Sequence, residues 1–309
     1  MPTTLFPRHP SSRRAALAGL LMTAGVSMTG LSPGAGAAQP APAGDGGAVP
    51  ADPERGLLGH VRQGTGPEPV VVLHEWMGDH TNYDAVRPFL PGDTHAWIFA
   101  DLRGYGLSKP LSGAYSLDEA VGDVLRLMDH YGHARFHVVG HSMSGMIAQA
   151  LAKRGGERVG SVVAVSPVPA SGFKTDAEGL KKLMAVVDND DAVRAAILAR
   201  GGGRYGLGWV ERKLAMTRRA PNREAMVGYL TMFTGTDVAD EVRGTPTPIT
   251  AVCGDHDLPL YRAESITRLL GPLFPNLEVV ISREAGHYAM LETPPLLAGQ
   301  IEKGLARGA

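Results

Sequence analysis

A serine flanked by small residues is the first feature of the chain that could do chemistry. Ser142 lies in Gly140-His-Ser-Met-Ser144, directly after an apolar run that ends at Val139. Small residues two positions before and after the serine allow a sharp turn from a strand into a helix, which exposes the hydroxyl. The short pattern alone is a weak signal, but a strand before it and a helix after it supply the required setting. We therefore expect Ser142 to be a nucleophile.

A serine hydroxyl needs a base to accept its proton and an acid to hold that base in one tautomer. His287 follows the last predicted strand and is the candidate base. Asp255 and Asp257 both follow the preceding strand, which ends at Cys253. The chain order is therefore serine, acid, histidine, an order used by one class of serine hydrolases. The residues alone leave the choice between the two aspartates open.

Short apolar runs alternate with helical patterns over most of the chain. We predict strands at 70–73, 96–100, 136–139, 162–165, 248–252 and 277–281, and helices at 115–131 and 146–154. Because right-handed crossovers connect such strands, the alternation predicts an α/β protein with a mostly parallel central sheet flanked by helices. The candidate catalytic residues all follow strands, so they are expected at one edge of this sheet.

The strand pattern stops between residues 167 and 245. Helical stretches are predicted there at 178–187, 191–200, 210–219 and 223–233. An insertion of this length between two strands of one sheet is far longer than an ordinary loop, and such insertions are often lids or binding elements. We interpret 167–245 as a helical cap inserted before the acid-bearing strand. Candidate pocket residues are Glu75, Trp209, Met232 and Phe233.

Four motifs resemble those of the α/β-hydrolase superfamily, and the resemblance runs over most of the chain after the N-terminal segment. They are Leu73-His74-Glu75-Trp76, Asp101-Leu-Arg103-Gly104-Tyr-Gly106-Leu-Ser108, the serine turn, and the pair Gly254-Asp255-His256-Asp257 and Ala285-Gly286-His287. The chain is most similar to small serine esterases, aryl esterases and cofactor-free perhydrolases. Haloalkane dehalogenases and epoxide hydrolases have a similar pattern but carry Asp where Ser142 stands.

The resemblance assigns further roles. It implies that Asp257, the second aspartate, is the acid, and that the backbone amides of Trp76 and Met143 hold the oxyanion. Glu75 stands where the family has glycine. Because an unpaired buried carboxylate is costly, we expect Glu75 to point outward into solvent, and pairing with Arg103 is the alternative.

The resemblance implies a serine hydrolase that cleaves a small-molecule carboxylic ester or lactone through an acyl-enzyme, with no metal and no organic cofactor. Perhydrolase or cofactor-free haloperoxidase activity and carbon–carbon bond hydrolysis remain alternatives, because they use the same triad. A non-catalytic binding protein of this fold is a further alternative. Such a protein usually lacks one of the triad residues, whereas this sequence has all three.

The first residues have a different composition from the rest. Residues 1–38 contain Arg13-Arg14, no acidic residue, an apolar stretch and Ala35-Gly-Ala37, a pattern that resembles a cleaved twin-arginine export signal and indicates a periplasmic or secreted protein. Residues 39–53, rich in Pro, Ala and Gly, are expected to be a disordered linker, and 54–309 the hydrolase domain.

Composition narrows the range of partners. The apolar stretch near the N-terminus is too interrupted to predict a stable membrane span. The formal charge of −1 gives no sign of nucleic-acid binding. A single cysteine excludes an internal disulfide and every Cys-based metal spacing. The oligomeric state is left open.

Overall fold

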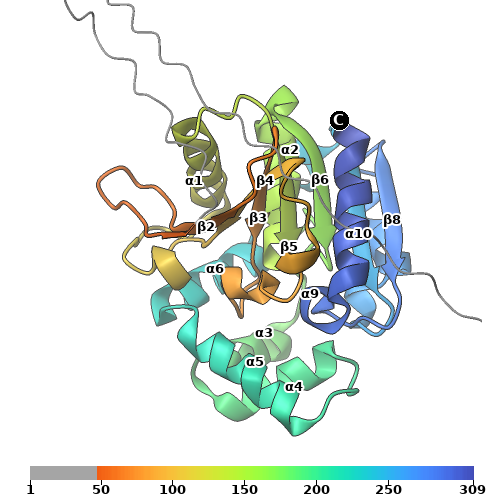
Figure 1. The fold of residues 1–309 in the computed structure, drawn as a ribbon. Coiled ribbons are helices and arrows are strands. Elements are labelled where there is room, and N and C mark those ends of the chain that lie inside the picture. The colour runs from red at the N-terminus through yellow and green to blue at the C-terminus, as the bar shows by residue number, and fades with distance from the viewer. Residues whose placement is uncertain (1–46) are drawn as a thin grey trace, which may run out of the picture. The chain divides into compact units, whose positions relative to one another are not determined.

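A sheet of eight strands forms the centre of residues 47–309, the part of the chain that a computed structural model describes (Figure 1). The strands occur in the order β1-β2-β4-β3-β5-β6-β7-β8 across the sheet. The pairs β1–β2 and β2–β4 are antiparallel, and the other five pairs are parallel. The strand bounds are β1 Ala48–Val49, β2 His60–Gln63, β3 Glu68–Leu73, β4 His95–Ala100, β5 Phe136–His141, β6 Val159–Val165, β7 Ile249–Gly254 and β8 Leu277–Ser282.

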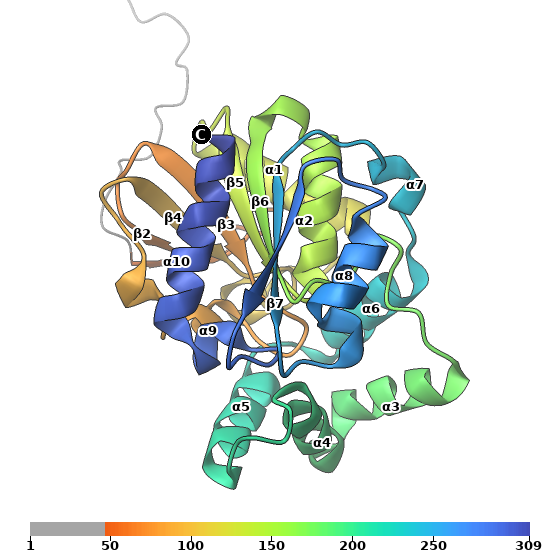
Figure 2. The same ribbon diagram turned by 90° about the vertical axis from the view of Figure 1, so that its right-hand side faces the viewer.

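Helices cover both faces of the sheet, which explains why the central strands are continuous apolar runs. Figure 2 shows α10 on one side of the sheet and α2 and α8 on the other. Two separate apolar clusters fill the two interfaces. The covering helices are α1 Leu117–His130, α2 Met143–Arg154, α8 Ala263–Leu270, α9 Ala289–Glu292 and α10 Pro294–Leu305. The α/β fold class expected from the sequence is therefore confirmed.

Five helices lie between β6 and β7, where the cap was predicted. They are α3 Ala177–Asp188, α4 Asp190–Arg200, α5 Leu207–Arg219, α6 Arg223–Gly235 and α7 Ala239–Val242. Side chains of Asp176, Asn189 and Asn222 accept backbone N–H bonds at the starts of α3, α4 and α6, which fixes where these helices begin. Figures 1 and 2 show α3, α4 and α5 gathered beyond one end of the sheet.

The N-terminal predictions have different outcomes. The expected export signal lies outside the described residues, as does the first part of the expected linker. The end of that linker differs from the prediction of disorder, because Ala48 and Val49 pair with Val61 and His60. This two-residue strand is exposed and has no apolar pattern, so the sequence offered nothing to indicate it. No helix within residues 47–309 is long and apolar enough to cross a membrane.

Candidate active site

Ser142 lies between β5 and α2 in a strained turn. Its φ of 54° and ψ of −112° are unusual for a residue with a side chain, and strain of this kind is common at functional sites. A Cβ at Gly140 would collide with the carbonyl oxygen of Ser144, and one at Gly145 would collide with the ring of Pro167. The small residues around Ser142 are therefore required by the turn.

Three predicted residues meet in one hydrogen-bonded chain. His287 Nε2 lies 2.9 Å from Ser142 Oγ, and His287 Nδ1 lies 2.8 Å from Asp257 Oδ2. The backbone N–H of Leu258 donates to the other carboxylate oxygen of Asp257 at 2.6 Å. His287 and Asp257 are each 1% exposed and Ser142 is 7% exposed. This arrangement can move a proton from the serine hydroxyl to the imidazole while the carboxylate holds the ring.

The structure separates the two candidate aspartates. Asp255 makes no contact with the His287 ring among the described interactions, and its Oδ1 lies 3.7 Å from Nε2 of the neighbouring His256. Its backbone N–H bonds to the carbonyl oxygen of Ser282 on β8. Asp257 is therefore the aspartate that the fold brings to the histidine.

The backbone amides of Trp76 and Met143 lie beside Ser142 and are the candidate anion-binding groups of this site. Trp76 and Met143 line the same cavity as the serine, and within residues 47–309 neither amide N–H has a hydrogen-bond acceptor. The indole of Trp76 is held by a bond to the carbonyl oxygen of Met226 on α6, at 2.7 Å. Because unpaired N–H groups are rare inside proteins, these two are available for a developing oxyanion.

The expectation that Glu75 points into solvent is wrong, and so is the alternative pairing with Arg103. Glu75 is only 2% exposed, and its carboxylate lies 2.6 Å from Nζ of Lys213 on α5, whereas Arg103 binds Asp123. The backbone N–H of Met77 donates to the second carboxylate oxygen at 2.5 Å. Burial alone would raise the pKa of Glu75, but the nearby Lys213 lowers it to about 2, so this carboxyl group stays ionised.

The loop that carries Glu75 is held without a glycine. Glu75 does not adopt a positive φ, so its side chain introduces no backbone strain. The ring of His74 donates to the carbonyl oxygen of Glu75 and accepts from the backbone N–H of Leu102. The hydroxyl of Ser144 donates to the carbonyl oxygen of His74 at 2.5 Å. The hydrogen bonds made by His74 and Ser144 therefore hold the loop beside the serine.

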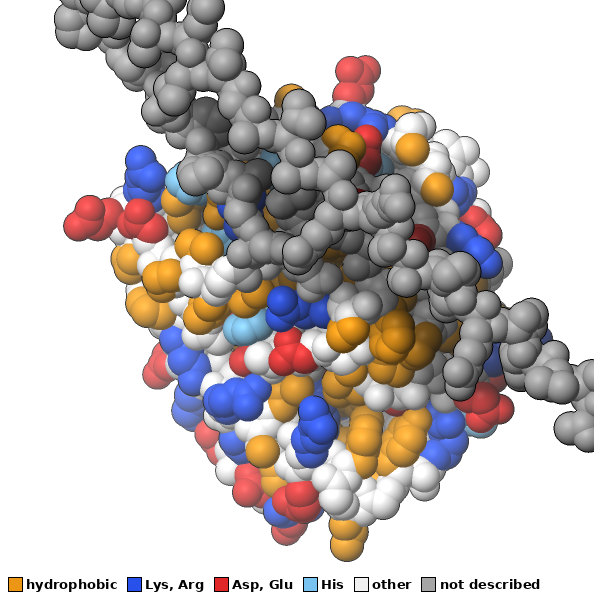
Figure 3. Space-filling view, viewed as in Figure 1, with side chains coloured by type: hydrophobic (Ala, Val, Ile, Leu, Met, Phe, Trp, Pro, Cys, Tyr) orange, Lys and Arg blue, Asp and Glu red, His pale blue; other side chains and the backbone are white. Residues whose placement is uncertain are grey.

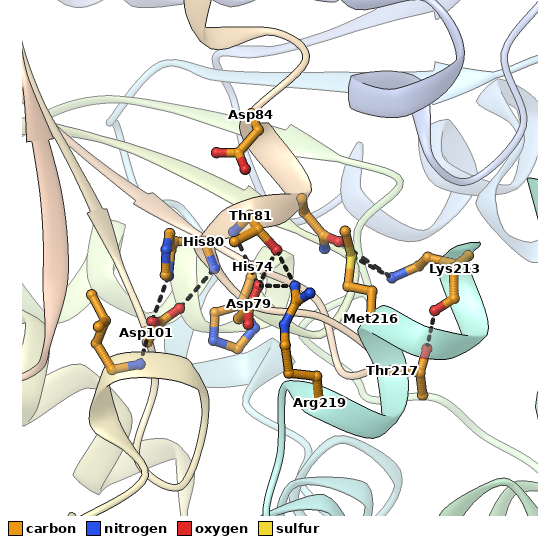
Figure 4. A network of polar contacts seen from close by, with 12 residues as sticks. His74, Asp79, His80, Thr81, Asp84, Asp101, Lys213, Met216, Thr217 and Arg219 are labelled. Carbon is orange, nitrogen blue, oxygen red and sulfur yellow. Dashed lines mark hydrogen bonds and ion pairs between the residues drawn. The ribbon is translucent and has the colours of Figure 1, made fainter. Parts of the chain in front are cut away.

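The cap helix α5 is bonded to this same loop region (Figure 4). Lys213 Nζ and the Thr217 hydroxyl both donate to the carbonyl oxygen of Met77, at 2.9 and 3.0 Å. Two residues beyond Thr217, Arg219 donates to the hydroxyl of Thr81 at 2.9 Å and lies 3.8 Å from Asp79. The cap and the loop after β3 are therefore one polar assembly, which the sequence could not reveal because its members lie far apart in the chain.

The cavity beside Ser142 is narrow. Its volume is about 10 Å³, close to the space of one water molecule. Glu75 and Phe233 line it as predicted, whereas Trp209 lines a separate depression and Met232 is buried without reaching the cavity. The lining also includes residues that the sequence did not indicate, namely Met77, Val168, Phe173, Leu183, Arg200 and Tyr261. Within residues 47–309 no group of three or more His, Cys, Asp or Glu side chains could hold a metal.

The sequence matches a model of a known protein family. Residues 68–294 match the family described by the alpha/beta hydrolase fold, which covers more than half of the chain. The chain therefore belongs to this family.

Individual relatives match to different extents. The chain is 39% identical over 109 residues to the dihydrolipoyllysine-residue acetyltransferase component of the acetoin cleaving system from Cupriavidus necator, covering 35% of this chain but 29% of that protein. It is 25% identical to a putative 2-succinyl-6-hydroxy-2,4-cyclohexadiene-1-carboxylate synthase from Bacillus subtilis, covering 74% of this chain and 87% of that protein. A bromoperoxidase structure from Bacillus anthracis has a TM-score of 0.73 at 18% identity, covering 84% of this chain and 100% of that one. A likeness at that identity shows the fold alone.

Breaking the Glu75–Lys213 pair is expected to destabilise the protein. Lys213→Met leaves a buried carboxylate without its partner, and removing one partner of a buried pair typically costs about 3–5 kcal/mol. Urea unfolding of the variant and the wild type measures the change in the free energy of unfolding. Lys182→Met is the matched control, because Lys182 forms an exposed pair with Glu178 and should change stability little. A Lys213→Met protein as stable as the wild type would contradict the assigned pairing.

Proposed function

We propose that this protein is a serine hydrolase that cleaves a carboxylic ester or lactone through an acyl-enzyme. The observation that carries the proposal is the bonded series from Ser142 through His287 to Asp257, buried next to two amides without acceptors. A base and an orienting acid activate a serine hydroxyl, and paired N–H donors stabilise the oxyanion of a tetrahedral intermediate.

Acylation follows from this geometry. Ser142 Oγ attacks the carbonyl carbon as its proton passes to Nε2 of His287, and Asp257 stabilises the imidazolium without taking the proton. The carbonyl electron pair moves to oxygen, where the amides of Trp76 and Met143 hold the negative charge. When the intermediate collapses, the ester C–O bond breaks and His287 returns the proton to the departing oxygen.

Deacylation repeats these steps with water. His287 removes a proton from water as the water oxygen attacks the acyl carbon, and the same amides hold the second oxyanion. The bond to Ser142 then breaks, the serine regains its proton, and the acid is released. Peroxide in place of water would give a peracid from the same acyl-enzyme.

A covalent probe tests the proposal. A fluorophosphonate should label the chain once, and peptide mass spectrometry should place the adduct on Ser142. Short and medium p-nitrophenyl esters should be hydrolysed by the same protein. Ser142→Ala should abolish both labelling and turnover. A wild-type protein that is folded but neither labelled nor active on any ester would contradict the proposal.

A further inference from the structure

Arg200 is a charged side chain in the cavity of Ser142. It is the last residue of α4, its side chain is partly buried, and it lines the cavity together with the serine. Its carbonyl oxygen accepts a hydrogen bond from the backbone N–H of His287 at 2.9 Å. The backbone of Arg200 is thus fixed directly to the loop that carries the candidate base.

Among residues 47–309 the guanidinium of Arg200 has almost no partner. Its one hydrogen bond runs from Nη1 to the carbonyl oxygen of Ala196, at 3.4 Å, in its own helix. Among residues 47–309 no carboxylate oxygen lies within 4.0 Å of it. By contrast, the nearby Arg194 and Arg204 each lie 2.7 Å from a glutamate. Of the five N–H donors of this arginine, the other four have no acceptor in the part of the chain that the structure describes.

The two carboxylates of the site, those of Glu75 and Asp257, each have another partner. Glu75 is neutralised by Lys213, and Asp257 is bonded to His287. Burial by itself lowers the pKa of Arg200, but neighbouring tyrosines and these two carboxylates raise it, so the guanidinium remains charged. The site therefore presents a fixed positive charge that its own residues do not pair.

A guanidinium that the described residues leave almost unpaired beside the serine is available to a ligand of opposite charge. The planar guanidinium fork matches a carboxylate in two parallel hydrogen bonds. Phe173, Leu183 and Phe233 give the remaining cap wall an apolar lining. On the basis of the proposed function, we propose that the substrate is an ester carrying a second, ionised carboxylate, and that Arg200 binds this carboxylate and directs the ester carbonyl toward Ser142.

Matched substrates test this proposal. Phenyl monoesters of glutaric and adipic acid would each be compared with the analogue in which the free carboxylate is methylated, after subtraction of the uncatalysed rate. The wild type should prefer the anionic ester. Arg200→Gln should lower kcat/KM for that ester about 10- to 100-fold, mainly through KM, and change the neutral ester less than about threefold. Arg200→Lys should recover part of the loss, since it restores the charge without the fork.

Arg194→Gln is the control variant, because Arg194 lies on the same helix but binds Glu211 on the surface. It should leave both substrates unaffected. Equal effects of Arg200→Gln on both esters, or no preference in the wild type, would overturn the role of Arg200 while leaving the hydrolase function intact.

A binding measurement separates the two proposals. Calorimetry with the Ser142→Ala protein and the phenyl monoamides of the same diacids should show binding that Arg200→Gln weakens about 10- to 100-fold. If this binding is found but no ester is hydrolysed by the wild type, the proposed function fails and the carboxylate site stands. If the anilides do not bind and the esters show no discrimination, the carboxylate site fails.

Discussion

Ser142→Ala is expected to lower kcat for a good ester substrate by about 10⁶-fold, and His287→Ala by a similar factor. The two groups act as one unit in the proposed mechanism, because the hydroxyl lies 2.9 Å from Nε2 and passes its proton to it. The double variant should therefore be no slower than either single variant. The small rate that remains should come from the oxyanion donors and from substrate binding, which neither substitution removes.

Steady-state rates of the three variants measure this coupling, with protein purified under conditions that exclude wild-type contamination. Ser112→Ala is a suitable control, because Ser112 is exposed and does not line the cavity. Losses that multiply in the double variant would mean that Ser142 and His287 act independently, which the proposed mechanism does not allow.

Asp257→Asn is expected to lower kcat by about 10⁴-fold, whereas Asp255→Asn should lower it less than about tenfold. An asparagine amide at position 257 can favour the wrong imidazole tautomer, in which Nε2 carries the proton and cannot act as base. Asp255 is the matched control because it lies two residues away on the same loop but does not contact the His287 ring.

The readout is kcat at a pH where the wild type is fully active, together with unfolding curves that show both variants to be folded. If Asp255→Asn were the more damaging substitution, the acid would have been assigned to the wrong residue. Comparable losses in both variants would show that the loop as a whole, and not one carboxylate, positions the base.

The sequence was sufficient for the parts of the fold that follow a local pattern. Apolar runs predicted the strands from β3 to β7 because strands buried on both faces have no polar alternation, and a further run predicted the edge strand β8. It was not sufficient for β2, whose residues His60–Gln63 have no such pattern and lie toward the antiparallel edge of the sheet. Nor did it indicate α10, which begins with proline at its first turn.

The site divides in the same way. Chain order and the surrounding motifs indicated Ser142 and His287 as nucleophile and base. The residues alone left two candidate aspartates, and the family resemblance selected Asp257. Glu75 was misjudged because its partner, Lys213, is distant in sequence and occurs on a helix where a lysine normally faces solvent. Arg200 has no motif at all, since only the packing of the cap makes it part of the cavity.

The bonds between the cap and the loop after β3 have a consequence for evolution and engineering. Lys213 on α5 neutralises Glu75, and the carbonyl of Met226 on α6 holds the indole of Trp76. The cap is consequently not an interchangeable module. A transplanted cap without this lysine would leave the buried carboxylate of Glu75 without its partner. A cap taken from a relative that carries glycine at position 75 therefore requires that position to be changed at the same time. The residue types at positions 75 and 213 should accordingly covary among related sequences.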